Sequence, residues 1–239
     1  MTVPTRTSFE IITDFLIADR EGPEGLTAPD RRLAKIGSLL AIDPAGTDLR
    51  AAFCEALEAG SSLNMLQAML LHAVGYLGVI RMRYAHQGLM AVLNEAGSEI
   101  EAGGPVESDR TLRVALGSQL YDRFDPGRQI EQAKLFEPLS ATYYPRAMEL
   151  SGLTLAPPAL ALRERQIMTI AMLSCLGGQS DQLRFHLAVA LRNEVERETL
   201  AGILILVQAY AGMPRANTAA TLTLEVLRDA GQSHGVYPL

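Results

Sequence analysis

The sequence predicts an all-α protein built from two related helical units. Between its proline and glycine breaks, apolar residues recur at the spacing of one helix face, as at Leu66, Met69, Leu70 and Ala73. Long runs that alternate every second residue are absent, and aromatic residues make up only 5%. The third observation is an internal repeat, in which the segment that starts at Ile36 matches the segment that starts at Ile170.

The repeat keeps one register over four predicted helices. Tyr76-x-Gly78 matches Tyr210-x-Gly212, and Val92-Leu93-x-x-Ala96-Gly97 matches Val226-Leu227-x-x-Ala230-Gly231. Two Leu/Ala-rich helical segments could match in places through composition alone. Shared motifs in one ungapped register favour duplication instead.

The predicted elements follow from this division. The first unit, residues 1–100, should contain helices over 30–40, 48–59 and 63–77, and a last helix that stops at Ala96-Gly97. The second unit, residues 105–239, should repeat them over 162–176, 181–193 and 196–210, with a last helix stopping at Ala230-Gly231. Residues 105–160 have no counterpart and predict an N-terminal arm with helices over 109–124 and 129–150.

Composition narrows the class of protein. The chain has 239 residues, 48% of them hydrophobic, which is enough for one large core or two small ones. With 21 basic and 27 acidic residues the net charge is −6, which argues against binding to nucleic acid or to anionic membranes. Two cysteines, Cys54 and Cys175, are too few for a disulfide scaffold or a structural zinc site.

The apolar segments 167–178 and 200–213 are shorter than the ~18 residues of a membrane span, and acidic residues interrupt the N-terminal apolar stretch. We therefore expect a soluble, cytoplasmic protein. No nucleotide, flavin or metal motif is present, so no cofactor is expected.

Several motifs of the second unit resemble the carboxymuconolactone decarboxylase family, which includes the alkylhydroperoxidase-D-like proteins. They are Leu162-Arg163-Glu164-Arg165-Gln166, Gln182-Leu183-Arg184-Phe185-His186 and Tyr210-Ala211-Gly212-Met213-Pro214-Arg215. The resemblance covers 105–231 well and 27–97 faintly, as in a tandem member with a degenerate first unit. It implies a helical enzyme fold that acts on small molecules.

Departures from the family pattern narrow the chemistry. The peroxidase branch carries Cys-x-x-Cys-x-x-x-His, and here Gln179 and Gln182 stand at the cysteine positions before His186. Thiol peroxidase activity is therefore not expected. Gln166 and Gly202 stand where the family usually has glutamates, so two candidate acids or bases are missing.

His186 is the predicted catalytic residue, because the resemblance places a site histidine there and because Ala52 is its counterpart in the first unit. A neutral imidazole can move protons near pH 7. The alternative is a histidine at the edge of the core that bonds a backbone carbonyl. His72 is interpreted as a core or pocket-edge residue and His86 as a surface residue, not as a shared metal site.

The predicted substrate-binding residues are Arg184, Arg165, Gln208, Tyr210 and Gln182. Either arginine could hold a substrate carboxylate with two parallel hydrogen bonds. Arg50 repeats Arg184, so a repeated structural ion pair is the alternative for that position.

Two hypotheses of function remain open. One is a cofactor-free lyase or isomerase acting on a small carboxylated or lactone-type substrate through His186. The other is a non-catalytic small-molecule binding or scaffold protein that keeps the fold without its acids.

Assembly follows from the apolar run over 200–207, which has no polar face and must be covered on every side. We expect it to pack on the matching helix over 65–74 and then on other chains. A homo-oligomer, with a trimer of two-unit chains favoured, is the prediction, and a monomer is the alternative.

Overall fold

The computed structural model describes residues 7–9, 25–97 and 108–234. These residues form helices and connecting turns without any strand, so the all-α prediction is confirmed. The helices, in chain order, are α2 (Ala28–Ile42), α3 (Thr47–Glu58), α4 (Leu63–Leu77), α5 (Val79–Glu95), α6 (Arg110–Phe124), α7 (Arg128–Phe136), α8 (Tyr143–Thr154), α9 (Leu162–Leu176), α10 (Ser180–Arg192), α11 (Arg197–Ala211) and α12 (Met213–His234). None of the described helices is both long and apolar enough to cross a membrane.

The helix bounds repeat in the register of the sequence, in which Ile36 is equivalent to Ile170. Both ends of α9 are equivalent to those of α2, and both ends of α11 are equivalent to those of α4. α12 begins at the position equivalent to the start of α5, while α10 begins one position before the equivalent of the start of α3. The same local signals therefore start and stop helices in both halves of the chain.

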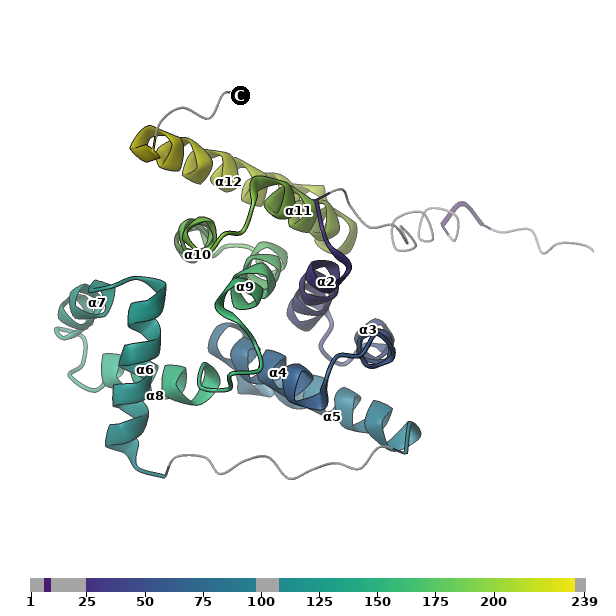
Figure 1. The fold of residues 1–239 in the computed structure, drawn as a ribbon, viewed down its shortest axis with the longest axis horizontal. Coiled ribbons are helices and arrows are strands. Elements are labelled where there is room, and N and C mark those ends of the chain that lie inside the picture. Colours follow the sequence, from purple (N-terminus) through teal and green to yellow (C-terminus); the bar gives the residue numbers. More distant parts are fainter. Residues whose placement is uncertain (1–6, 10–24, 98–107, 235–239) are drawn as a thin grey trace, which may run out of the picture.

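The two halves meet where α2 packs on α9, at the centre of the molecule (Figure 1). Gly37 allows this close approach, because a Cβ atom there would lie only 2.8 Å from the carbonyl oxygen of Met168. The consequence for α9 is burial on every side, since each residue from Arg165 to Cys175 is buried.

The expected packing of α11 on α4 is wrong. α11 packs mainly on α2, α9 and α12, while α4 packs on α5, α8 and α9. The reason is that the α2–α9 pair occupies the centre, and each of the two apolar helices packs against it. One side of each apolar helix stays uncovered within the chain, at Leu71 of α4 and at the equivalent residue of α11, Ile205.

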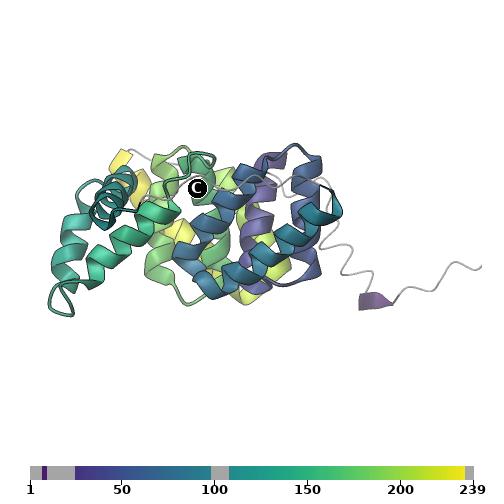
Figure 2. The same cartoon turned by 90° about the horizontal axis from the view of Figure 1, so that it is seen from below.

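The arm differs from the expectation of two long helices. Residues 129–150 do not form one helix but divide into α7 and α8, separated by a turn that contains Pro138 and Ser140. Proline removes a backbone donor, and the Ser140 hydroxyl accepts a hydrogen bond from the backbone N–H of Thr142. The three helices of the arm lie together at one end of the molecule (Figure 2).

The two predicted glycine stops behave differently. α5 ends before Ala96-Gly97, and Gly97 has a φ of +63°, as expected of a residue just past a helix. α12 instead continues through Gly231 to His234, so the predicted stop at Ala230-Gly231 is wrong. Gly231 is not among the residues with positive φ and simply continues the helix.

α6 and α8 are held together by a glycine contact and a buried acid. A Cβ at Gly117 would lie 1.8 Å from the carbonyl oxygen of Met148, and one at Gly152 would lie 2.1 Å from that of Arg113. Glu149 accepts hydrogen bonds from Arg113, Arg146 and Arg110, which hold the pKa of its carboxyl down at about 2.

We predict that Gly117→Ala destabilises the protein by about 1–3 kcal/mol, because the added methyl group must push α6 away from the backbone of α8. Urea unfolding measures this, and hydrogen exchange should show faster exchange in α6 and α8.

The matched control is Gly75→Ala in α4, where the nearest atom to the new Cβ is Thr154 Oγ1 at 3.8 Å. This change should leave stability equal or raise it by about 0.5–1 kcal/mol. Equal losses in the two variants would contradict the close contact.

Candidate functional site

His186 lies on α10, on the side of the helix that faces the interior. α10 begins after Gly177 and Gly178, both with positive φ, and places Leu183 and Leu187 in the core. His186 follows Leu183 by three positions and is only 5% exposed. The histidine is therefore part of the interior and is not a surface residue.

Gln166 of α9 fixes the protonation of the His186 ring. Its Oε1 lies 2.9 Å from Nδ1 of His186. Because an amide oxygen can only accept, Nδ1 carries the hydrogen and Nε2 of the neutral ring keeps its lone pair. The Nε2 of Gln166 itself is buried without a hydrogen-bond partner among the described residues. The site thus holds an imidazole nitrogen that can accept a proton and an amide that can donate a hydrogen bond.

Two aromatic side chains of α4 complete the interior of the site. Tyr76 packs with its ring centroid 5.3 Å from that of His186 and 5.0 Å from that of His72. His72 and Tyr76 are four residues apart and therefore share one face of α4. The first half of the chain thus supplies one wall of the site around a histidine of the second half.

His72 belongs to a second hydrogen-bonded chain. Arg165 Nη1 lies 3.3 Å from Nδ1 of His72, and Thr169 Oγ1 lies 2.8 Å from its Nε2. Since a guanidinium can only donate, Nδ1 accepts and Nε2 donates to Thr169. The Thr169 side chain also hydrogen-bonds Tyr76. The two buried histidines are thereby held in opposite tautomers.

Most of the hydrogen bonds that Arg165 donates go to backbone carbonyl oxygens. Besides His72, its guanidinium donates to four carbonyl oxygens in the segment between α8 and α9, those of Thr154, Leu155, Pro157 and Leu160. The side chain is 4% exposed. Its contacts tie this segment to α9 while leaving one edge of the guanidinium on His72.

The arm closes the site toward solvent. Phe185 packs edge-on to His186 with ring centroids 5.0 Å apart, and stacks on Tyr121 of α6 with centroids 6.3 Å apart. The Arg128 guanidinium of α7 lies 4.4 Å from the centroid of the Phe185 ring. This cation–π contact places a positive charge at the outer edge of the site.

Burial keeps these groups neutral. It lowers the pKa of His186 to about 3, with a smaller contribution from the positive charge of Arg128. It also holds the pKa of His72 well below its usual value, helped by Arg165 and His186, and raises the pKa of Tyr76 to about 12. At pH 7 the site therefore presents two neutral imidazoles and a neutral phenol.

The structure brings together two of the predicted site residues, His186 and Arg165. Arg184 does not join them, because its guanidinium pairs with Glu225 of α12. Arg50 pairs in the same way with Glu95 of α5, at 2.6 Å. Both halves thus pair this arginine with an acid of the equivalent helix, although the two acids are not equivalent positions, since the counterpart of Glu95 is Asp229. This favours the alternative of a structural ion pair.

The other predicted binding residues lie elsewhere. Gln182 and Gln208 are exposed, and no described hydrogen bond joins them to His186. Tyr210 is half-buried, and the nearby carboxylates of Glu55 and Asp48 add to the effect of burial in raising its pKa to about 12. It is the counterpart of Tyr76 on the opposite side of the α2–α9 pair.

Sequence reasoning misses Arg128 and undervalues Gln166 and Tyr76. Arg128 lies in the arm, which has no counterpart in the repeat, so no comparison within the chain could mark it. The sequence shows Gln166 only as a position where the family usually has a glutamate. It does not show the hydrogen bond to His186, because most of a helix and a turn separate the two residues along the chain. For α4, the four-residue spacing of His72 and Tyr76, which puts both on one helix face, is the sequence feature that could have indicated its place in the site.

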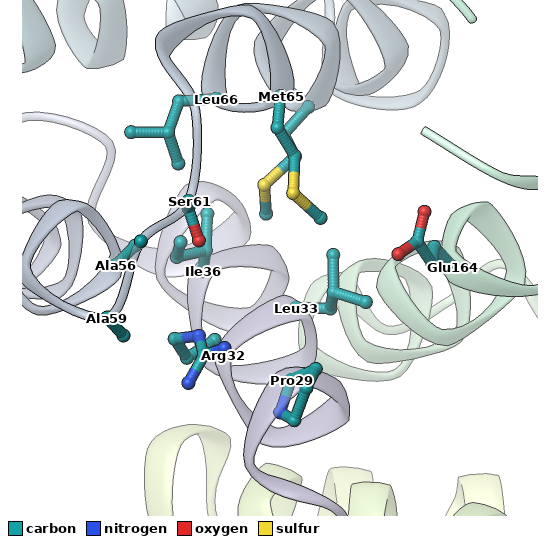
Figure 3. Close-up of a pocket in the computed structure, with 12 residues that line it drawn as sticks. Pro29, Arg32, Leu33, Ile36, Ala56, Ala59, Ser61, Met65, Leu66 and Glu164 are labelled. Carbon is teal, nitrogen blue, oxygen red and sulfur yellow. The ribbon is translucent and has the colours of Figure 1, made fainter. Parts of the chain in front are cut away.

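Other features of the structure lie apart from this cluster. Figure 3 shows a pocket of about 230 Å³, lined on its apolar side by Leu33, Ile36 and Met65 and reached from α9 by Glu164. No predicted site residue lines it. Within the described residues, no three histidine, cysteine, aspartate or glutamate side chains gather as metal ligands. Burial raises the pKa of the Cys175 thiol to about 11, which disfavours a reactive thiolate.

Comparison with known proteins covers α9 and α10 of the site, but not the residues that α4, α6 and α7 contribute. The model of the Carboxymuconolactone decarboxylase family matches residues 141–225. A 4-carboxymuconolactone decarboxylase of Acinetobacter baylyi is 36% identical over 74 residues, which are 31% of this chain and 54% of the relative. The chain thus spans about half the length of the curated relative that it matches. The residues that match the family model include Arg165, Gln166 and His186.

Proposed function

We propose that this protein is a cofactor-free lyase or isomerase that acts on a small carboxylated or lactone-type substrate by proton transfer through His186. The observation that carries the proposal is the His186–Gln166 hydrogen bond of 2.9 Å. It leaves Nε2 of a neutral, buried imidazole free to take a proton. The family match supports a decarboxylase-like activity over residues 141–225.

A neutral imidazole in this position acts first as a base. It can remove a proton from carbon next to a carbonyl group and return it to another carbon, so that a double bond moves and no atom is lost. Gln166 Oε1 stabilises the imidazolium formed between the two steps, because Nδ1–H donates to it. Isomerisation needs no further proton donor.

Decarboxylation by the same residue requires the imidazole to start protonated. The C–C bond to the carboxylate then breaks, its electron pair moves into the conjugated lactone, and the imidazolium delivers the proton to carbon. A pKa of about 3 opposes formation of the imidazolium in the free protein, both here and in the isomerisation. A substrate carboxylate bound beside Arg128 would offset the cation and raise the pKa of His186.

Arg128 is the carboxylate-binding residue of this proposal in place of Arg184. Its side chain is half-buried against Phe185, and its charge already acts on His186. Arg184 pairs with Glu225, away from the ring cluster. Arg128 also lies 3.8 Å from Asp125 of the preceding turn, so a substrate carboxylate would share or replace this longer ion pair. The substrate would reach His186 by displacing the Phe185 ring, which separates the histidine from solvent.

The second candidate function is non-catalytic binding of a small molecule. The observation that favours it is the replacement of a carboxylate by Gln166 beside the only histidine of α10. An amide cannot exchange protons with the ring. Such a protein would bind the same class of ligand and release it unchanged.

We also propose that the chain forms a homo-oligomer, with a trimer favoured. Apolar side chains stay exposed at matching positions of the two halves, Leu71 and Val79 in one and Ile205 and Met213 in the other. Exposed apolar residues that gather on neighbouring helices mark association surfaces.

Light scattering at micromolar concentration should give a mass near three times the 25.8 kDa of one chain. The interface should bury more than roughly 1,000 Å², the size that a specific association needs. A mass near 25.8 kDa at all concentrations would contradict the assembly.

The activity test uses 4-carboxymuconolactone and a panel of small lactone and unsaturated carboxylic acids. We expect turnover of at least one compound and a loss of at least about hundredfold in kcat for His186→Ala, because general acid–base catalysis contributes that much or more. Arg128→Gln should raise KM for carboxylated substrates. Ultraviolet absorbance and released CO₂ distinguish isomerisation from decarboxylation.

His86→Ala is the matched control, because His86 is exposed on α5. Its activity should equal that of the unchanged protein. Full activity in a folded His186→Ala variant would overturn the catalytic role. A compound that raises Tm and is recovered unchanged would support the binding function instead.

Stability should fall as the pH falls from about 6.5 toward 3. The pKa of His186 is about 3 in the folded protein and near 6.5 in the unfolded chain, so the unfolded chain binds more protons in this range. Between pH 7 and pH 5, keeping His186 neutral should cost about 2 kcal/mol, and His72, whose pKa is also lowered, adds a loss of the same sign. Urea unfolding at the two pH values measures the loss.

His186→Ala should remove about 2 kcal/mol of this loss, and the part due to His72 should remain, because that ring stays buried with its pKa held low. His86→Ala should leave the dependence unchanged. An equal loss of stability in the unchanged protein and in His186→Ala would show that His186 is not kept neutral by the fold.

A further inference from the structure

A second cavity lies between α9, α10 and α12, apart from the His186 cluster. Its volume is about 400 Å³, within the range of small-molecule sites. Leu173, Leu183 and Leu222 form an apolar side. The start of α10 and the start of α12 supply the rest, and no aspartate or glutamate is among the residues that line it.

The polar end of the cavity is positive. α10 begins there at Ser180, and its N-cap residue Gln179 makes no side-chain capping hydrogen bond. The acid of its first turn, Asp181, is exposed and is not among the residues that line the cavity. The N-terminal end of a helix carries partial positive charge and unpaired backbone N–H groups. Arg215, in the first turn of α12, lies against Gly177 and has no described hydrogen bond or ion pair. Two helix starts and one guanidinium therefore meet at an end of the cavity that no carboxylate lines.

Ser174 gives independent evidence for a missing partner. It lines the cavity, is 2% exposed, and its Oγ has no hydrogen-bond partner among the described residues. A buried hydroxyl without a partner costs free energy that a bound acceptor or donor would recover. The counterpart of Ser174 in the first half is Leu40, so the fold does not require a hydroxyl at this position.

The first half of the chain shows which group fits. There the carboxylate of Asp43 lies against Gly46, the residue directly before α3, where its Oδ2 would be 2.1 Å from an added Cβ. The counterparts of Asp43 and Gly46 are Gly177 and Ser180. The first half thus carries a carboxylate directly before the helix, whereas the acid nearest the start of α10, Asp181, lies in its first turn and does not line the cavity.

The equivalent arginines of the two halves, Arg81 and Arg215, also differ in their hydrogen bonding. Arg81, the counterpart of Arg215, donates a hydrogen bond to the carbonyl oxygen of Ala41. The Arg81 guanidinium thus has an acceptor within the protein. Arg215 makes no such described bond, although it occupies the equivalent helix position.

We propose that this cavity binds a small organic carboxylate. Its carboxylate would take the place that Asp43 fills in the first half, between the start of α10 and the Arg215 guanidinium. Its apolar body would lie on Leu173, Leu183 and Leu222, and its polar edge would meet the Ser174 hydroxyl. The site is separate from His186 and does not depend on the catalytic proposal.

The test follows binding of hexanoate to the full chain by ¹H–¹⁵N NMR and calorimetry. Hexanoate should shift the amide resonances of Gln179, Ser180 and Arg215 in a saturable way, and hexanamide, which has the same length and no charge, should not. Inorganic phosphate serves as the second anion. Phosphate should not displace hexanoate, because it has no apolar part to pack against the leucines of the cavity.

Arg215→Gln should weaken hexanoate binding by about tenfold or more, since it removes a charge-assisted hydrogen bond. Ser174→Leu, which copies the first half, should also weaken it by filling the cavity, and Ser174→Ala is the milder variant. Arg83→Gln is the matched control: Arg83 is exposed on α5, outside the cavity, and this change should leave binding unaltered.

Hexanoate binding that persists unchanged in both Arg215→Gln and Ser174→Ala would overturn the proposal. So would the absence of saturable hexanoate binding, or equal binding of hexanamide. Displacement of hexanoate by low concentrations of phosphate would also overturn it, since the site would then be a general oxyanion site. His186→Ala should bind hexanoate normally, which keeps this test independent of the activity test.

Discussion

The close packing of α2 on α9 determines where polar side chains can find partners. Gly37 lets the two helices approach until α9 has no solvent-facing side over most of its length. The polar residues of α9 must then be satisfied inside the protein, because buried polar groups without partners are costly. Gln166 bonds His186, and Arg165 and Thr169 bond His72. The candidate site is thus the set of partners that a fully buried polar helix face requires.

This origin explains why the site combines residues from both halves. The counterparts of Gln166, Thr169 and His186 are Arg32, Lys35 and Ala52, and these are not a cluster of neutral buried groups. Lys35 instead pairs with Glu55 at a partly exposed position. One side of the α2–α9 pair therefore keeps neutral imidazole and amide groups, together with the buried Arg165, beneath the arm. The other side carries charged groups that remain in contact with water.

Periodicity and the internal repeat are sufficient to predict the all-α fold and most helix bounds, because both depend on local sequence. The repeat cannot predict that α11 does not pack on α4, since apolar residues indicate that a helix face is buried but not which helix covers it. Pro138 is a visible signal for dividing the helix over 129–150, which periodicity alone leaves whole. For the site, resemblance and a missing counterpart predict His186. The grouping of Arg184 with it is wrong, because sequence spacing does not show that the residue turns toward Glu225.

The backbone contacts of Arg165 have a mechanical consequence. One guanidinium holds four carbonyl oxygens of the segment that leads out of the arm, and the same group donates to Nδ1 of His72. The arm cannot swing away from α9 as a rigid piece without stretching these bonds together. Such a movement would remove the acceptors that hold the guanidinium in place, and would thereby weaken the orientation of its donor toward Nδ1 of His72. The position of the arm and the direction of the His72–Thr169 hydrogen bond are therefore linked through the side chain of Arg165.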